Sequence, residues 1–177
     1  RLILALCLLL AGPAFANDWD ALDTPGAIAI MRHALAPGTG DPANVTIGDC
    51  STQRNLDARG RAQAEAIGQA FRERGHAFDR VLTSQWCRCR DTANLLALGP
   101  VEEVPALNSF FRDRSTRDAQ TEATRAIVES TQERLFLVTH FVNIRALTGT
   151  SVRSGEVLII RPGASGIEVL GSILIDP

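Results

Sequence analysis

The sequence predicts an α/β fold, a three-layer α/β/α sandwich around a largely parallel central sheet. Short apolar runs that are typical of buried strands alternate with longer segments whose apolar residues recur at helical spacing. Such alternation is typical of a parallel sheet covered by helices on both faces. The chain has 177 residues, 45% of them hydrophobic and 21% charged, which is enough for one sizeable core.

The first segment, residues 1–16 (RLILALCLLLAGPAFA), has the pattern of a secretory signal peptide. One arginine precedes an apolar run, and Ala14-Phe15-Ala16 forms an A-x-A cleavage site before Asn17. The apolar run is shorter than the roughly 20 residues that a membrane-spanning helix needs. We therefore expect a cleaved signal at 1–16 and a single domain at 17–177, in the periplasm or outside the cell. A buried or anchoring N-terminal helix is the alternative.

The first half of the domain contains two expected strand–helix units. Residues 27–31 (AIAIM) form a short Ile-rich run that predicts a buried strand, and a loop rich in Gly and Pro follows at 36–49. Residues 56–75 carry apolar side chains at helical spacing and end in glycine, which closes helices. The next strand is expected at 79–84 and the next helix at 87–98.

The second half continues the alternation and ends in two strands. Residues 101–115 predict a strand followed by a loop, and residues 118–133 have helical spacing. An apolar strand at 134–140 ends in a histidine, and a short helix follows it. The closing elements are a helix at 143–149 and strands at 156–162 and 167–175.

Charge limits the class of partner. The net charge is −2, which gives no indication of a nucleic-acid partner. All 18 basic residues are arginine, a side chain that can grip phosphate or carboxylate with two parallel hydrogen bonds.

Polar side chains follow three of the expected strands. Arg32 and His33 come after the first, Thr83 and Ser84 after the second, and Thr139 and His140 after a later one. Arg88 lies in the first turn of the helix that follows Ser84. Because ligands bind beyond the carboxyl ends of parallel strands, these groups are expected to form one anion pocket.

Each of these residues has a plain structural explanation when it is taken alone. Arg32 could pair with a surface carboxylate, Arg88 could be a solvated helix charge, and either histidine could be a satisfied polar residue at the sheet edge. Their joint position at three strand ends favours a common site. No carboxylate occurs among the strand-end residues, so we expect no acid to neutralise them.

Four segments carry a resemblance to a known family. They are MRHA at 31–34, NLDARGRAQA at 55–64, LTSQWCRCRDTANLL at 82–96 and LVTHFVNIRALTG at 137–149. In this order they resemble the histidine phosphatase superfamily, which has the phosphoglycerate-mutase-like fold. The resemblance implies that His33 is a nucleophile that takes phosphate. It also implies that Arg32, Arg88 and His140 hold the phosphoryl oxygens, without metal or organic cofactor.

The sequence departs from that family at the proton donor. In the mutase-like branch a glutamate stands where this chain has Ser109, and in the acid-phosphatase branch an acid follows the second histidine, where this chain has Phe141 and Val142. Asp113 is the nearest carboxylate and the candidate donor, and Asp118 and Glu122 are the alternatives. A surface ion pair with a neighbouring arginine is its alternative role.

Three cysteines remain after the signal, and at most one intramolecular disulfide can form. Relative to the elements that carry the resemblance, Cys50 lies in the loop after the first strand and Cys87 directly precedes Arg88. A Cys50–Cys87 bond would fix that loop to the pocket rim, with Cys50–Cys89 as the rival pairing. The C-x-C spacing lacks the second ligand pair of a zinc site.

Together these features predict an exported phosphomonoesterase. Its substrate is expected to be a small phosphomonoester. A phosphorylated sugar is one candidate, because the exported members of the superfamily that this sequence resembles include some that act on such sugars. No nucleic acid and no membrane span are expected. The alternative is a phosphate-binding or phosphosugar-binding protein of the same fold with little or no turnover.

Overall fold

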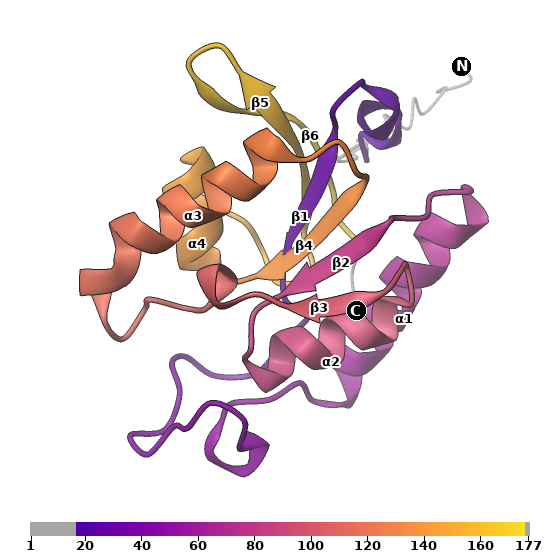
Figure 1. Cartoon of the computed structure of the whole chain (residues 1–177). Helices are drawn as coiled ribbons and strands as arrows, with labels where there is room; N and C mark the ends of the chain where they lie inside the picture. The colour runs from indigo at the N-terminus through magenta and orange to yellow at the C-terminus, as the bar shows by residue number, and fades with distance from the viewer. Residues whose placement is uncertain (1–16, 176–177) are drawn as a thin grey trace, which may run out of the picture.

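A computed structural model describes residues 17–175. Its centre is a six-stranded sheet with the strand order β3-β2-β4-β1-β5-β6 (Figure 1). The expected signal peptide lies outside the described residues.

Four strands of the sheet pair with one another in parallel, and two more are added by antiparallel pairing. The parallel strands are β1 (Ile28–Arg32), β2 (Arg80–Thr83), β3 (Val101–Glu103) and β4 (Leu135–Thr139). The antiparallel strands β5 (Val157–Gly163) and β6 (Gly166–Ile173) extend the sheet from β1. The predicted largely parallel sheet is therefore confirmed.

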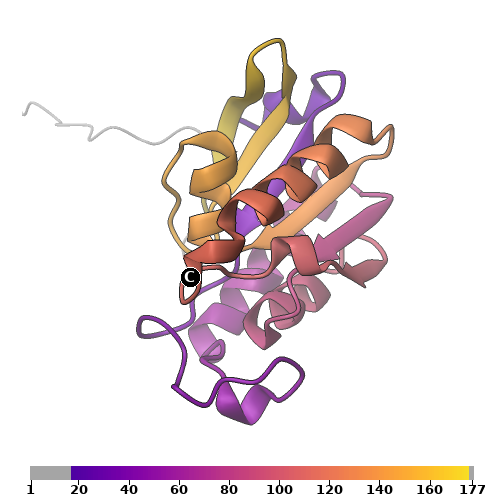
Figure 2. The ribbon, with the colours of Figure 1, turned by 60° about the vertical axis from the view of Figure 1, so that its left-hand side comes forward.

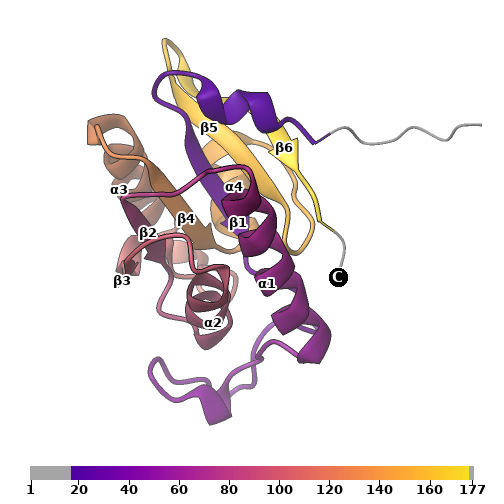
Figure 3. The same cartoon turned by 90° about the vertical axis from the view of Figure 1, so that its right-hand side faces the viewer.

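Helices cover both faces of this sheet, which confirms the three layers. Figure 3 shows α1 (Ala58–Glu73) and α2 (Cys87–Leu96) on one face. Figure 2 shows α3 (Arg117–Ser130) and α4 (Phe141–Thr148) on the other. Short 3₁₀ turns occupy the connections, at η1 (Trp19–Asp23), η2 (Cys50–Thr52), η3 (Pro105–Leu107) and η4 (Arg114–Thr116).

The central strands are buried on both faces, and their side chains alternate between two cores. On β1, Ala29 and Met31 face the core under α1 and α2, whereas Ile28 and Ile30 face the core under α3 and α4. Strand β4 alternates in the same way. This burial explains why the strands appear in the sequence as continuous apolar runs.

Helix α4 begins earlier than predicted, at Phe141 directly after β4. The carbonyl of His140 accepts the first intrahelical bond, from the amide of Ile144 at 3.1 Å. His140 is thus the N-cap residue, and its side chain stays at the strand end instead of moving onto a helix face.

Helices α1 and α2 approach closely at a glycine. Gly68 is buried in α1, and a Cβ atom at this position would collide with the backbone carbonyl of Leu96 at the end of α2. The contact requires glycine, although glycine lowers helix propensity. This contact matters for the site because Arg88 lies in the first turn of α2.

Gly68→Ala is therefore expected to destabilise the protein, although alanine is the better helix former by about 1 kcal/mol. Overpacking at such a contact lowers the free energy of unfolding by about 1–3 kcal/mol, even after neighbouring atoms have shifted to make room. Urea denaturation of the variant measures the loss. The control is Glu65→Ala on the exposed face of α1, which should leave the free energy of unfolding nearly unchanged. Equal stabilities for Gly68→Ala and wild type would contradict the described packing.

Candidate active site

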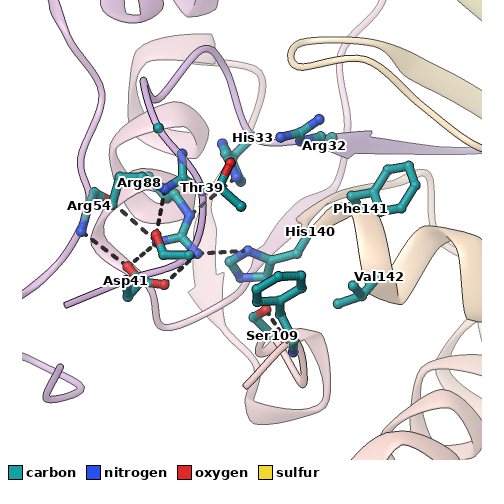
Figure 4. Close-up of a pocket in the computed structure, with 13 residues that line it drawn as sticks. Arg32, His33, Thr39, Asp41, Arg54, Arg88, Ser109, His140, Phe141 and Val142 are labelled. Carbon is teal, nitrogen blue, oxygen red and sulfur yellow. Dashed lines mark hydrogen bonds and ion pairs between the residues drawn. The ribbon is translucent and has the colours of Figure 1, made fainter. Parts of the chain in front are cut away.

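The carboxyl ends of the parallel strands meet beneath the long loop between β1 and α1. The amide of His33 donates to Thr139 O and that of Ser84 to Val138 O, both at 3.0 Å, which fixes the three strand ends side by side. They border a cavity of about 300 Å³, shown in Figure 4. Its lining residues are Arg32, His33, Gly38, Thr39, Gly40, Asp41, Arg54, Arg88, Ser109, Phe111, His140, Phe141 and Val142.

His33 has a defined tautomer. Its Nδ1 atom lies 2.7 Å from Ala34 O, an acceptor, so Nδ1 carries the proton and Nε2 is the unprotonated nitrogen, with a lone pair that can accept. Burial and then the charge of Arg88 lower the pKa of His33 well below its ordinary value, although the bond to Ala34 acts in the other direction. The ring is therefore neutral at physiological pH and presents a nucleophilic nitrogen to the cavity.

Arg88 uses all five of its N–H donors. Its Nη1 and Nη2 atoms bind the two carboxylate oxygens of Asp41 at 2.7 and 3.1 Å, and Nη1 also donates to Arg54 O at 3.2 Å. The remaining two hydrogens point at imidazole nitrogens. Arg88 Nε donates to His33 Nε2 at 3.2 Å, and Arg88 Nη2 donates to His140 Nδ1 at 3.4 Å.

This division orients the guanidinium. One edge is held by fixed acceptors of the protein, and the Nε/Nη2 edge faces the two imidazoles. That edge has the geometry to grip two oxygens of a tetrahedral anion placed between His33 and His140. Asp41 is therefore the group that aims Arg88, and its carboxylate compensates part of the positive charge.

Asp41 is itself held as a carboxylate. Burial alone would raise the pKa of Asp41, but the hydrogen bonds and charge of Arg88, with the amide of Arg54 and the indole of Trp86, outweigh it and lower the pKa. The indole donates from Nε1 to Oδ2 at 3.2 Å.

His140 is fixed by a chain of polar side chains. Because Nδ1 accepts from Arg88, Nε2 carries the proton and donates to Ser84 Oγ at 2.9 Å. Ser84 in turn donates to Asn108 Oδ1 at 3.2 Å. Burial and then the charge of Arg88 lower the pKa of His140 well below its ordinary value, so this ring is also neutral.

Two more arginines add positive charge to the cavity. Among residues 17–175, no carboxylate pairs with Arg32, whose Nε is buried without a hydrogen-bond partner. Arg54 donates to the carbonyls of Ala36 and Gly40, which holds the loop against the site. Burial and the charge of Arg88 lower the pKa of both guanidiniums. Three arginines against one carboxylate make a site for an anion.

A family profile decides the relationship of this chain to known proteins. The profile of the histidine phosphatase superfamily (branch 1) matches residues 28–115, which include Arg32, His33 and Arg88. The chain belongs to the histidine phosphatase superfamily. The family expected from the sequence is thereby confirmed.

Solved structures show the same fold. A phosphoglycerate mutase from Thermus thermophilus is 18% identical, with a TM-score of 0.61 over 85% of this chain and 99% of the other. The protein histidine phosphatase SixA, solved with tungstate, is 15% identical, with a TM-score of 0.58 over 83% and 96%. A phosphoserine phosphatase from Entamoeba histolytica, solved with phosphoserine, is 11% identical, with a TM-score of 0.57 over 82% and 95%. Among curated protein sequences none matches this chain significantly.

The structure brings four of the sequence-predicted site residues together. Arg32, His33, Arg88 and His140 all line the cavity of this histidine phosphatase fold. Asp113 is not among the lining residues. It is exposed, and its carboxylate accepts from the hydroxyl and the amide of Ser115, which lower its pKa. The geometry gives Asp113 the role of a turn cap, not of a proton donor.

Sequence reasoning missed Asp41, Arg54 and Phe111. The expectation that no acid neutralises the strand-end arginines was wrong, because Asp41 of the 36–49 loop reaches Arg88. The available signal was the loop itself, whose length and position after the Arg-His strand indicate a wall of the site. Nothing in its local pattern distinguishes Asp41 from Asp49, which caps a 3₁₀ turn.

A disulfide closes the rim of the site. Cys50 and Cys87 are bonded, with Cα atoms 5.7 Å apart, and Cys89 is a free buried thiol. The Cys50–Cys87 pairing is therefore confirmed over its rival. Burial raises the pKa of Cys89 to about 12, so this thiol stays protonated beside His140.

Within residues 17–175, no cluster of three or more His, Cys, Asp or Glu side chains is arranged to hold a metal ion. In the same part of the chain, no helix has the length and apolar character that crossing a bilayer requires.

The buried histidines make stability depend on pH. Their lowered pKa values mean that the unfolded chain binds protons which the native protein does not, so stability falls as the pH drops below about 6.5. His140→Gln should reduce the slope of unfolding free energy against pH by up to ~1.4 kcal/mol per pH unit. Urea denaturation between about pH 7 and about pH 5 measures this slope. His76→Gln, outside the cavity and less buried, should change it less.

Removing the disulfide should loosen the loop that carries Asp41. The double variant Cys50→Ser, Cys87→Ser is expected to lose about 2–4 kcal/mol of stability. Dithiothreitol should lower the melting temperature of wild type to that of the double variant and leave the double variant unchanged. If three thiols can be titrated, so that reduction is complete, and the melting temperature of wild type is unchanged, this stabilising role is contradicted.

Proposed function

We propose that this histidine phosphatase superfamily member is an exported phosphomonoesterase that works through a phosphohistidine on His33. One observation carries the proposal: a buried, neutral imidazole presents its Nε2 lone pair to a cavity that contains three arginines and a second neutral histidine. Phosphoryl transfer needs mainly positioning and neutralisation of the phosphoryl oxygens, and this cavity supplies both.

In the first step, the substrate phosphate replaces the direct contact of Arg88 Nε with His33 Nε2. The Nε/Nη2 edge of Arg88 and the guanidinium of Arg32 bind its oxygens. The His33 Nε2 lone pair forms the N–P bond while the ester P–O bond breaks, and the leaving alkoxide takes the bonding electron pair. The Nδ1–H bond to Ala34 O stabilises the positive charge that develops on the ring.

In the second step, a water molecule attacks phosphorus and the N–P bond breaks. The bonding pair returns to His33 Nε2, and the water proton passes to solvent or to the released phosphate. The products are inorganic phosphate and a neutral His33, so the cycle closes without net change in the protein.

Export is proposed from two features. The segment at 1–16 has the pattern of a secretory signal. The Cys50–Cys87 disulfide agrees with it, because such bonds persist in oxidising compartments.

A second candidate function is anion binding without turnover. The observation that favours it is the lining of the cavity: Ser109 takes the place of the expected glutamate, and Asp41 is an ion-paired carboxylate that cannot donate a proton. His33 favours the enzyme, since the lone pair of its unprotonated Nε2 serves attack on phosphorus rather than anion binding.

The test is hydrolysis of 4-nitrophenyl phosphate by protein of residues 17–177 without added metal. Wild type should release phosphate and form an acid-labile, alkali-stable phosphoenzyme, and His33→Ala should lose both. His76→Ala, a histidine outside the cavity, should retain activity within about two-fold. If wild type forms no phosphoenzyme and is as slow as His33→Ala, yet phosphate raises its melting temperature, the binding function replaces the enzyme.

A further inference from the structure

Three apolar side chains line the cavity together with its arginines. They are Phe111, Phe141 and Val142, and we refer to them as the apolar rim. The arginines can hold the phosphate of a substrate, so the rim faces the part of the substrate that leaves. This part of the site therefore bears on the choice of alcohol, which the proposed function leaves open.

Phe111 is exposed beyond what its size favours. Its side chain has 52% of its surface accessible, the largest fraction among the exposed large hydrophobic residues of the described chain. The segment is nevertheless anchored, because the Phe111 amide donates to Ser109 Oγ at 3.3 Å and Arg112 Nη2 donates to Ala43 O at 2.9 Å. An apolar side chain fixed at the mouth of a site is typical of a ligand contact.

The apolar surface continues past Phe111 into a second hollow. This hollow shares Gly40, Asp41, Ser109 and Phe111 with the first and adds Ala43, Val45, Trp86 and Arg112. The path from the arginines over Phe111 thus leads to further aliphatic and indole surface. Apart from the residues that can bind phosphate, the first cavity offers only the hydroxyls of Thr39 and Ser109 as neutral side-chain hydrogen-bond partners. A sugar ring has more hydroxyl groups than these two side chains could bind.

Phe141 completes the rim beside the second histidine. It is the first residue of α4, directly after His140, and its ring lies 5.9 Å from the guanidinium carbon of Arg32. Figure 4 shows its ring beyond His140, on the side of the cavity away from Asp41. A ring in the substrate could therefore contact Phe141 while its phosphate contacts Arg32.

The leaving-group chemistry points to the same class of substrate. The cavity holds no protonated carboxyl group, because Asp41 is ion-paired with Arg88 and the lining contains no other acid. General-acid help is worth about 10²–10⁴ in rate, so its absence disfavours alkyl esters. A phenol has a pKa of about 10, as in tyrosine, and its oxide leaves far more readily than an alkoxide.

We propose that the substrates are aryl phosphates, monoesters of a phenol whose ring lies against the apolar rim. This inference rests on the proposed function and narrows its substrate class, away from the phosphorylated sugar. In the step that breaks the P–O bond, phosphorus passes to His33 Nε2. The aryl oxide leaves with the bonding electrons and takes its proton from water.

The experiment separates ring recognition from leaving-group reactivity. Values of kcat/KM are measured for 1-naphthyl phosphate, for acetyl phosphate, which has a good leaving group and no ring, and for glucose 6-phosphate. Wild type should prefer naphthyl phosphate to acetyl phosphate and should be slowest on the sugar phosphate. A phosphotyrosine peptide distinguishes the two sources of an aryl phosphate, because comparable turnover indicates a protein substrate and poor turnover a small phenol.

Phe111→Ala tests the rim. It should lower kcat/KM for naphthyl phosphate by about ten-fold, the equivalent of ~1.4 kcal/mol of lost contact. It should change the value for acetyl phosphate by less than about two-fold, since that substrate does not reach the rim. The control is Ile47→Ala, an exposed apolar residue of the 36–49 loop that lies outside both hollows and should affect neither substrate.

The outcomes separate the two proposals. Equal losses on both substrates in Phe111→Ala, or a wild type that prefers glucose 6-phosphate, overturn the aryl phosphate inference while the phosphatase itself stands. If none of these substrates turns over and none labels His33, the proposed function fails and the inference fails with it.

Discussion

The contact on which the site depends is the ion pair between Asp41 and Arg88. Both partners are largely withdrawn from solvent, with 12% and 3% of their side-chain surfaces exposed. A buried pair of this kind is strongly destabilising to break, because the remaining charge is left uncompensated. Here the ion pair also fixes the orientation of the Arg88 guanidinium. Once one edge of the guanidinium is occupied by Asp41 and by the Arg54 carbonyl, its other edge can face only the two histidines.

The fold supplies the other half of this geometry through its strand order. Strand β4 lies between β1 and β2, so His140 arrives between the residues that follow its two neighbours. Because these strands are buried on both faces, their ends have little freedom to shift. The two imidazoles approach edge to face with ring centroids 5.5 Å apart, and neither carries a charge. A rigid sheet thus holds two neutral bases beside a cluster of cations, an arrangement that solvent would not sustain.

The sequence predicted the parts of the site that depend on local pattern. Arg32, His33 and His140 follow apolar runs, and the rule that strand ends share one sheet edge was sufficient to group them. Asp41 and Phe111 could not be found in this way, because each reaches the cavity from an irregular segment and through contacts distant in sequence. The choice of Asp113 as proton donor also depended on tertiary contacts that the sequence does not show. The nearness of Asp113 to the site along the chain did not reveal that Ser115 already binds its carboxylate.

The disulfide also shapes the chain before it folds. Asp41 and Arg88 are separated by 47 residues, a long loop to close in an unfolded chain. The Cys50–Cys87 bond joins a residue of the Asp41 loop to the immediate neighbour of Arg88, so the path between the two charges shrinks to about ten residues. Each halving of a loop saves about 0.6 kcal/mol of closure entropy, which makes this shortcut worth ~1.3 kcal/mol. In the oxidised chain, the least local contact of the site becomes a nearly local one, and contacts of low sequence separation form fastest.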